Sequence, residues 1–311
     1  MLHFNDVYNI EEKGTAAVGD SEWNVVAGAP KFVKAWKNRE TETSLNLFSG
    51  DLFSPSHLST HLKGEQMLKV FNSLNCKVSC LGNHDLDFGV ETMKDLTGRT
   101  APCKWLISNI NVEGKPIGDL QTYTTENVTL TNGQRLKVGF FGLAGPDWPG
   151  QMSPACHEEL EYTEYVVKGR EMAAMLRAEP HNCDLIVALT HMRVNEDRIL
   201  AAEVQGIDLI LGGHDHSYVA EVNENTGVFL IKSGTDFEEF SDFSLFCGVI
   251  NESDFASVEC TDTPWLKHLY SKQKQMFCKI EKVQITANLE KDPEIEAHVE
   301  EKTSALNEKL N

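Results

Sequence analysis

The chain contains no long hydrophobic run, no dense cluster of basic residues and no Cys-x-x-Cys pair. Its apolar stretches do not approach the roughly 20 residues that a membrane-spanning helix needs. Met1 leads almost directly into polar residues, without the basic and apolar regions of a signal peptide. We therefore expect neither a membrane span nor a signal peptide in the sequence as written. With 41% hydrophobic and 24% charged residues among 311, the composition is that of a folded globular protein.

Acidic residues greatly outnumber basic residues in this chain. There are 47 acidic and 28 basic residues, which gives a net charge of −19. A protein that binds a nucleic-acid backbone normally carries a basic stripe, and no Lys/Arg cluster here is dense enough to form one. We therefore expect no binding to a nucleic-acid backbone. An anionic ligand would have to be attracted by something else, and bound metal ions are the obvious source because they can be the largest local charges in a site.

The cysteines favour a reducing compartment. They form no Cys-x-x-Cys pair, which also excludes a four-cysteine or Cys₂His₂ zinc site. We therefore expect a cytoplasmic protein. The sequons that begin at Asn127 and Asn251 favour the alternative, a secreted protein whose signal peptide has been removed. The eight cysteines are Cys76, Cys80, Cys103, Cys156, Cys183, Cys247, Cys260 and Cys278.

Short apolar runs alternate with helical patterns along most of the chain, which is typical of an α/β fold. Seven runs are predicted strands: Leu45–Phe48, Lys77–Leu81, Lys104–Ser108, Leu136–Gly142, Asp184–Thr190, Ile207–Gly212 and Val228–Ser233. Four segments with apolar residues at three- and four-residue spacing are predicted helices: Ala27–Asn38, Gly64–Leu74, Thr163–Ala178 and Asn195–Val204.

An antiparallel element is predicted from about Leu120 onward. Tyr123–Leu130 and Leu136–Leu143 flank Asn132-Gly133, a strong hairpin signal, so the sheet is mixed. After Gly213 the predicted strands follow one another with no long helix between them until about Pro264. The second half therefore predicts a largely antiparallel sheet, packed face to face against the first. Its strands are Val219–Val222, Phe229–Lys232 and Phe243–Ile250.

Polar residues with metal-ligand chemistry recur at the ends of five predicted strands. In an open α/β sheet, sites form at the carboxyl ends of the strands, because the loops converge there while the sheet holds them rigid. A single Asp or His after a strand is more often a turn or structural residue, but five such motifs together indicate a site. Glycines before them would let the backbone bend, so that the next side chain points into the cleft. The motifs are Asp6, Gly50-Asp51, Gly82-Asn83-His84-Asp85, Thr190-His191 and Gly212-Gly213-His214-Asp215-His216.

The mixture of carboxylates, one amide and several imidazoles predicts divalent metal ions. Borderline ions accept such a set, whereas an all-oxygen Ca²⁺ site would not use three histidines. One carboxylate bridging two ions some 3.5–4 Å apart would form a two-metal hydrolytic site, in which both ions hold the oxygens of an in-line displacement. The identity of the ions is left open among Mn, Zn, Fe, Co and Mg.

These motifs, in this order, closely resemble those of the calcineurin-like metallophosphoesterases. Three longer segments resemble the 5′-nucleotidase branch of that family: Leu2-His3-Phe4-Asn5-Asp6, Gly50-Asp51-Leu52-Phe53-Ser54-Pro55-Ser56 and Gly82-Asn83-His84-Asp85-Leu86-Asp87-Phe88-Gly89. The resemblance covers about residues 1–285. It implies a four-layer αββα sandwich of two mixed sheets, which agrees with the two sheets predicted above.

The resemblance also implies a role for each site residue. Asp51 would bridge the two ions. His84 would bind no metal and would face the leaving oxygen, with Asp87 orienting its ring. The implied ligands of one ion are Asp6, Asp51 and His216, and those of the other are Asp51, Asn83, His191 and His214.

The first motif departs from the family pattern at Tyr8. The family has Asp-x-His, and Tyr8 stands at the position of the histidine. On a strand, Asp6 and Tyr8 would point to the same face, so Tyr8 could reach the site. Its phenol has a reference pKa near 10, so it would ligate well only if a strongly acidic ion ionised it. We favour a neutral residue in the wall of the site over a metal ligand.

The end of the chain is a second departure. Full-length members of the branch usually carry a C-terminal domain with aromatic residues that bind the nucleobase. Here the segment Lys291–Asn311 is predicted to form a polar helix, with Ile295, Val299 and Leu306 at roughly helical spacing. We divide the chain into a catalytic domain, residues 1–285, and a C-terminal helix, residues 286–311. The helix would be a cap or a linker to a domain that the chain lacks.

Several other residues have two interpretations. Arg193 could grip phosphate oxygens with its bidentate guanidinium or lie on the surface at a helix start, and Asn83 could also contact substrate. His57 and His61 are expected on the surface. Trp148 could stack on a base or sugar, although packing onto its own domain is the commoner outcome. Cys76 and Cys80 flank a strand, would lie on the same side of it and are expected in the core.

We therefore expect a metal-dependent phosphomonoesterase of the 5′-nucleotidase type, in which a metal-bound hydroxide attacks the phosphorus of a small phosphate ester. The first alternative is a phosphodiesterase acting on cyclic nucleotides or nucleotide sugars. The second is a catalytically inactive binding module stabilised by metal. The presence of His84 and Asp87 argues against the inactive module. The sequence does not predict an oligomeric state.

Overall fold

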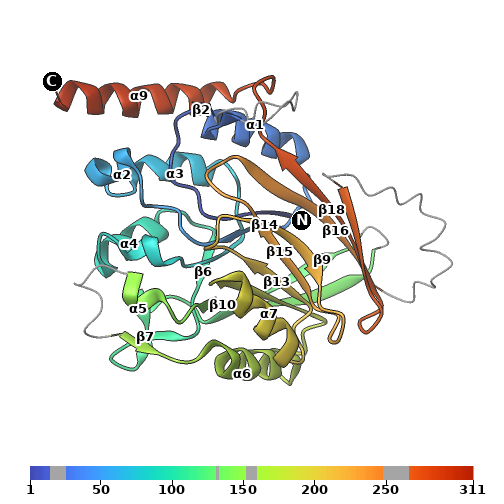
Figure 1. Cartoon of the computed structure of the whole chain (residues 1–311). Coiled ribbons are helices and arrows are strands. Elements are labelled where there is room, and N and C mark those ends of the chain that lie inside the picture. Colours follow the sequence, from blue (N-terminus) through green and yellow to red (C-terminus); the bar gives the residue numbers. More distant parts are fainter. Residues whose placement is uncertain (15–25, 131–132, 152–159, 248–265, 311) are drawn as a thin grey trace.

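Two β-sheets pack face to face between two layers of helices (Figure 1). The computed structural model describes residues 1–14, 26–130, 133–151, 160–247 and 266–310. One layer covers the outer face of the larger sheet and contains α1 (Ala29–Arg39), α3 (Glu65–Asn72) and α9 (Pro293–Leu310). The other layer covers the outer face of the smaller sheet and contains α6 (Tyr165–Arg177) and α7 (Val194–Glu203). This is the αββα sandwich that the family resemblance implies.

The larger sheet has seven strands, in the order β17-β18-β16-β1-β4-β5-β6. The four strands from β1 to β6 run parallel, while β16, β18 and β17 join them by antiparallel pairing. The bounds are β1 (Leu2–Phe4), β4 (Asn46–Ser49), β5 (Val78–Cys80), β6 (Lys104–Leu106), β16 (Glu239–Cys247), β17 (Leu266–Ser271) and β18 (Met276–Gln284).

The smaller of the two main sheets has six strands, in the order β14-β15-β13-β12-β10-β9. Its central strands are parallel, and β9 and β14 are antiparallel edges. The bounds are β9 (Tyr123–Thr129), β10 (Arg135–Ala144), β12 (Leu185–His191), β13 (Leu209–Gly212), β14 (Tyr218–Val222) and β15 (Phe229–Ser233).

Shorter elements complete the described part of the chain. Two small sheets contain β2 (Lys13–Gly14) with β3 (Val26–Ala27), and β7 (Ile110–Val112) with β8 (Lys115–Pro116) and β11 (Leu160–Tyr162). The remaining helices are α2 (His57–Leu62), α4 (Val90–Gly98), α5 (Trp148–Gln151) and the 3₁₀ turns η1 (Asn83–Leu86) and η2 (Ile117–Asp119). In the described residues no helix has both the length and the apolar composition that a membrane crossing requires.

The central strand β12 shows why the sequence forms this sandwich. Leu185, Val187 and Leu189 point between the two sheets, where they join the inter-sheet core. Ile186 and Ala188 point the other way, into the core beneath α6 and α7. A strand covered on both faces is apolar at every position, which is the pattern of a buried parallel sheet.

The predicted division of the two sheets between the two halves of the chain is wrong. β14 and β15 belong to the same sheet as β10, β12 and β13, whereas β16 crosses to the other sheet and pairs with β1. The apolar runs of these strands look alike in sequence, so periodicity identifies the strands but not the sheet that each one joins. The crossing places the amino terminus of the chain at the centre of the larger sheet (Figure 1).

Two further predictions concern the second half. The chain after Pro264 forms the hairpin of β17 and β18 rather than a helix, and Pro264 itself lies outside the described residues. The β9–β10 hairpin is confirmed by pairing from Thr129 with Arg135 to Tyr123 with Phe141. Its predicted turn residue Asn132 is also outside the described part, as are Asn251, Cys156, Cys260 and residues 248–250.

The predicted C-terminal helix is present as α9 and lies against α1, α2 and α3. Ile295 and Leu306 are buried in the core beneath it, and His298 Nε2 donates to the carbonyl of Gln66 at 2.9 Å. The boundary at residue 285 stays a prediction.

The described cysteines are all unpaired, and Cys76 and Cys80 are buried, as predicted. They do not share one side of β5, however, because Cys76 precedes the strand. It packs under the helices, whereas Cys80 lies between the sheets.

Candidate metal centre

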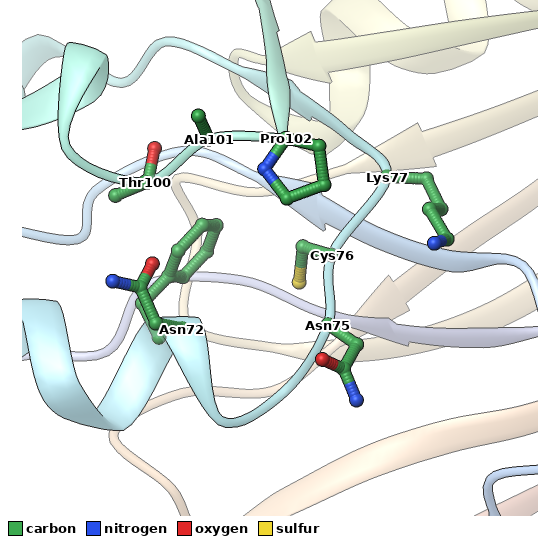
Figure 2. Close-up of a pocket in the computed structure, with 8 residues that line it drawn as sticks. Asn72, Asn75, Cys76, Lys77, Thr100, Ala101 and Pro102 are labelled. Atoms are coloured by element: carbon green, nitrogen blue, oxygen red, sulfur yellow. The ribbon is translucent and has the colours of Figure 1, made fainter.

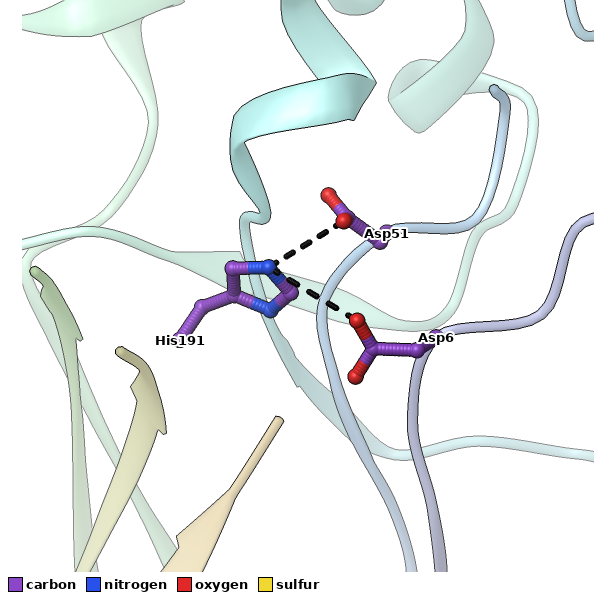
Figure 3. Close-up of side chains that lie close together, drawn as sticks. All are labelled: Asp6, Asp51 and His191. Carbon is purple, nitrogen blue, oxygen red and sulfur yellow. Dashed lines mark ion pairs between the residues drawn. The ribbon is translucent and has the colours of Figure 1, made fainter. Parts of the chain in front are cut away.

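The predicted site residues meet at the carboxyl ends of parallel strands from both sheets. Three of them offer ligand atoms that all lie within 4.8 Å of one another: Asp6, Asp51 and His191. Figure 3 shows the three side chains converging, with the imidazole facing both carboxylates. The predicted ligands are, in chain order, Asp6 after β1, Asp51 after β4, Asn83 at the start of η1, His191 at the end of β12, and His214 and His216 after β13.

Four of these residues adopt a left-handed backbone. The φ angles are 51° at Asp6, 64° at Asp51, 81° at His214 and 57° at His216. Such angles are costly for residues that carry a Cβ, and they cluster at functional sites. The expectation that Asp6 and Tyr8 lie on one strand is also wrong, because β1 ends at Phe4 and Asp6 turns the chain out of the strand. The strand alternation expected for Asp6 and Tyr8 is therefore absent.

Two glycines let the site loops approach one another. A Cβ on Gly82 would lie 2.2 Å from both the backbone nitrogen and Oδ1 of Asp51, and one on Gly213 would lie 2.8 Å from Asp6 Oδ2. We expected such glycines to bend the backbone. Gly50 does so, with a φ of 87°, but Gly82 has an ordinary φ of −103°. At Gly82 the missing side chain supplies space rather than conformational freedom.

Asp51 presents its two carboxylate oxygens to different groups. Oδ1 accepts from the backbone nitrogen of His84 at 2.8 Å. Oδ2 lies 3.2 Å from His191 Nε2 and 3.1 Å from the hydroxyl of Tyr8. The two oxygens of Asp51 therefore face different neighbours.

His191 is held with one nitrogen toward the carboxylates. Its Nδ1 donates to the carbonyl of Ser49 at 2.8 Å, which leaves Nε2 facing Asp51 and Asp6. Burial favours the neutral ring, but the charges of Asp51 and Asp6 outweigh it and raise the pKa of His191 to about 10. The pocket therefore favours a positive charge at this point.

Asn83 is the most direct indication that the pocket fits a metal ion. Its side chain is fully buried, and neither Oδ1 nor Nδ2 makes a hydrogen bond. His191 Nε2, by contrast, is paired with Asp51 Oδ2 at 3.2 Å. A buried polar atom without a partner is rare and requires an explanation, such as an ion or water that completes the site. Asn83 adjoins His84, whose backbone nitrogen donates to Asp51 Oδ1 at 2.8 Å, and amide, imidazole and carboxylate groups together are a donor set that a divalent cation accepts.

The hydroxyl of Tyr8 does reach the centre. It lies 2.9 Å from Asp6 Oδ1, 3.1 Å from Asp51 Oδ2 and 2.8 Å from His216 Nε2. Ligands that share one ion at about 2.1 Å are separated from each other by about 3.0–3.4 Å. The phenol thus occupies a ligand-like position, although burial and the charges of Asp51 and Asp6 raise its pKa far above the ordinary value.

His214 is oriented by a residue that sequence reasoning did not identify. His214 Nε2 pairs with Asp147 Oδ2 at 3.0 Å, which leaves Nδ1 free of this partner, and the His214 ring lies 5.0 Å from the ring of His191 between centroids. The same oxygen of Asp147 lies 2.9 Å from Arg193 Nε. Asp147 lies in a loop with no metal-site spacing in the sequence, so only the fold reveals its role. Arg193 is half exposed at the rim and is engaged through Nε.

His84 and Asp87 form the predicted pair. His84 Nδ1 lies 2.9 Å from Asp87 Oδ2, and both side chains are partly exposed. Burial lowers the pKa of His84, but the hydrogen bond to Asp87 and the charge of Asp51 together raise it above the ordinary value. Nε2 is then the nitrogen available to a substrate.

Comparison with known proteins shows the family to which the chain belongs. The family described as calcineurin-like phosphoesterase matches residues 1–218, the range that contains all of the residues described above. The chain belongs to this family. The resemblance inferred from the five sequence motifs is thereby confirmed.

Individual relatives cover the chain in part. It is 27% identical over 244 residues to the snake venom 5′-nucleotidase of Gloydius brevicauda, which is 75% of this chain and 40% of that protein. It is 28% identical over 236 residues to the trifunctional nucleotide phosphoesterase protein YfkN of Bacillus subtilis, which is 65% of this chain and 16% of that protein. The chain therefore spans less than half the length of either relative.

A solved structure shares the fold over almost the whole chain. The 5′-nucleotidase precursor from Thermus thermophilus superposes with a TM-score of 0.76 at 18% sequence identity. The superposition covers 98% of this chain and 58% of that one. It supports the αββα architecture.

The structure also shows where Trp148, His57 and His61 lie in this calcineurin-like phosphoesterase. Trp148 is fully buried and donates from Nε1 to the carbonyl of His191 at 2.9 Å, so it packs onto its own domain and cannot stack on a ligand. His57 and His61 are exposed on α2, as predicted. A shallow cleft of about 50 Å³ beside Cys76, Lys77 and Pro102 (Figure 2) lies at the amino ends of β5 and β6, opposite the centre.

Asp85 is a further residue whose role the sequence did not reveal. Its Oδ1 accepts from the backbone nitrogens of Leu52 and Phe53, and its Oδ2 from those of Gly82 and Asp51. Burial and the charge of Asp51 raise its pKa to about 7 against the effect of these donors. Asp85 thus fixes the loop that carries Asp51. The sequence motif alone does not specify these contacts.

Proposed function

We propose that this calcineurin-like phosphoesterase is a metal-dependent phosphohydrolase that acts on phosphate monoesters in the manner of a 5′-nucleotidase. The observation that carries the proposal is the buried amide of Asn83 without a hydrogen-bond partner, together with the cluster of Asp6, Asp51 and His191 and the His84–Asp87 pair. The names of the relatives, which are nucleotidases and a nucleotide phosphoesterase, support the substrate class.

Two divalent ions are proposed, in keeping with the two-sided contacts of Asp51. Asp6, Asp51 and His216 would hold one ion, and Asp51, Asn83, His191 and His214 the other. When bound, the ions would supply the activation of water and the positive charge that attracts an anionic ester into a protein of net charge −19.

The protein's own residues would orient the ions and the substrate and would protonate the leaving oxygen. Asp51 would fix the spacing of the two ion positions, while its Oδ1 holds the backbone of His84. His84, whose pKa the hydrogen bond to Asp87 helps to raise against the effect of burial, would stabilise or protonate the departing oxygen through Nε2. Arg193, held by Asp147 at the rim, would grip a phosphate oxygen with its Nη groups, and Asn83 would contact substrate as well as metal.

Hydrolysis assays would separate this proposal from its alternatives. The chain should be tested with nucleoside monophosphates, cyclic nucleotides, nucleotide sugars, sugar phosphates and an aryl phosphate, each with Mn²⁺, Zn²⁺, Mg²⁺, Fe²⁺ or Co²⁺. We expect nucleoside monophosphates to be cleaved fastest. Faster cleavage of diesters would favour the phosphodiesterase alternative. Metal binding without any hydrolysis would favour the inactive binding module.

Tyr8 variants test whether the phenol is a ligand. If Tyr8 is a neutral wall residue, Tyr8→Phe should leave metal content and rate within a few-fold of wild type. Tyr8→His should tighten the first ion, because it restores a nitrogen ligand at a ligand-like distance from Asp6 and His216. A visible phenolate-to-metal charge-transfer band in the wild-type protein that disappears in Tyr8→Phe would contradict the wall assignment.

Arg193 should affect substrate affinity more than turnover. Removing a charge-assisted hydrogen bond costs about 1.5–3 kcal/mol, so Arg193→Met should raise KM by about tenfold or more. Arg198→Met is a matched control, because Arg198 lies on the same helix and pairs with Glu221 on the surface. An unchanged KM in Arg193→Met would show that Arg193 pairs with Asp147 but does not contact the substrate.

A further inference from the structure

A lysine ammonium is buried directly beneath the histidine loops of the centre. Lys232 lies on β15, the parallel neighbour of β13, and its side chain is only 1% exposed. A buried ammonium is costly unless it is paired and hydrogen-bonded. The identity of its partners therefore shows which parts of the fold it holds.

The ammonium donates three hydrogen bonds. Nζ lies 2.7 Å from the carbonyl of Met192, 2.7 Å from the carbonyl of Gly213 and 2.5 Å from Asp215 Oδ2. Met192 directly follows His191, Gly213 directly precedes His214, and Asp215 separates His214 from His216. Each bond is therefore made to a residue that adjoins a proposed histidine ligand.

Two carboxylates complete the network and extend it to α7. Asp197 Oδ2 forms an ion pair with Lys232 Nζ at 2.9 Å, and its Oδ1 accepts from the hydroxyl of Thr190 at 2.6 Å. Asp215 Oδ2 also accepts from the backbone nitrogen of Val194 at 2.5 Å. The network thus joins the ends of β12 and β13 to the start of α7.

Gly212 makes room for this network. A Cβ at Gly212 would lie 2.8 Å from Lys232 Cε and 2.8 Å from Asp197 Oδ2. The adjacent Gly213 instead leaves space for Asp6. The two glycines before His214 therefore make room on different sides. Gly213 makes room on the side that faces the metal centre, and Gly212 makes room for the buried ion network.

We propose that Lys232, together with Asp197 and Asp215, is a positioning residue that holds His191, His214 and His216 at the ligand positions of the centre. The inference rests on the proposed metal site, and it concerns how that site is held rather than which reaction it performs. Groups that orient metal ligands typically contribute about 10- to 100-fold in metal affinity. A network that only stabilised the core would leave the affinity of a folded variant unchanged.

Metal titration of variants tests the inference. Mn²⁺ affinity would be measured by calorimetry, Co²⁺ binding by its visible spectrum, and folding by thermal denaturation, for wild type, Lys232→Met and Asp215→Asn. Arg198→Met is the control, because it removes a positive charge from an exposed ion pair on α7, the helix that also carries Asp197. Lys232→Met leaves two carboxylates without their cation. The double variant Asp197→Asn/Lys232→Met leaves only one and conserves the net charge of the network, so it keeps the test decisive if the single variant does not fold.

We expect folded Lys232 variants to bind Mn²⁺ about 10- to 100-fold more weakly and to show an altered Co²⁺ spectrum. Asp215→Asn should show a smaller change in the same direction, and Arg198→Met should match wild type. Folded variants with wild-type affinity and spectrum would overturn the inference while leaving the proposed function intact. Wild-type protein that binds neither ion would overturn both.

Discussion

Asp51→Asn is expected to abolish metal binding at both positions of the centre. Asp51 is 1% exposed, and its Oδ2 faces His191 and Tyr8 while its Oδ1 holds the backbone of His84. An amide keeps the shape but removes the negative charge that both ions would share. We expect metal affinity to fall by more than the roughly 100-fold that an orienting contact contributes, and hydrolysis to fall with occupancy.

Metal content measured by mass spectrometry after dialysis tests this expectation. Asp208→Asn is a suitable control, because Asp208 is also a buried aspartate, with 5% exposure, but lies before β13, at the opposite end of the strand, where it pairs with Lys274. The control should lose stability and keep its metal. Equal metal content in Asp51→Asn and wild type would remove Asp51 from the bridging position.

His84→Asn is expected to lower kcat by about 10²–10⁴ without changing metal content. The loss follows from the position of His84 beside Asp51, held through Nδ1 by Asp87 and carrying no metal in our assignment. It should be larger for a ribose 5′-oxygen, which needs a proton to depart, than for a nitrophenolate, which does not. Asp87→Asn should follow the same pattern more mildly, because it disturbs only the orientation and charge of the ring.

The comparison of two leaving groups, with metal analysis of each variant, is the measurement. His57→Asn provides the control, since His57 is an exposed histidine on α2. Loss of a metal in His84→Asn, or equal slowing of both leaving groups, would reassign His84 as a ligand or a phosphate-positioning group.

The strands and the strand-end motifs could be predicted from the sequence because they are local. The apolar run Leu185–Leu189 is buried on both faces whichever strands flank it, and the loop after it must lie at the carboxyl edge of the sheet. The choice of sheet for β16 depends on pairing with β1, more than two hundred residues earlier in the chain, which no local pattern encodes.

The same distinction applies to the centre. Asp6, Asp51 and His191 were identifiable because their residue types suit metal ions and follow strands. Asp147 and Lys232 were not, because an aspartate in a loop or a lysine in a strand has no spacing that marks it. Asp85 belongs to a predicted motif, but the motif did not indicate its role. The roles of Asp147, Asp85 and Lys232 come from the residues that the fold places beside them: His214, the Asp51 loop and the carbonyl of Gly213.

The central claim is that two ions share Asp51, and anomalous scattering from crystals grown with Mn²⁺ or Zn²⁺ tests it most directly. We expect two anomalous peaks some 3.5–4 Å apart on either side of the Asp51 carboxylate, one beside Asp6 and His216 and the other beside Asn83, His191 and His214. A crystal with metal present but no peak at Asp51, or with these side chains pointing away from one another, would contradict the account.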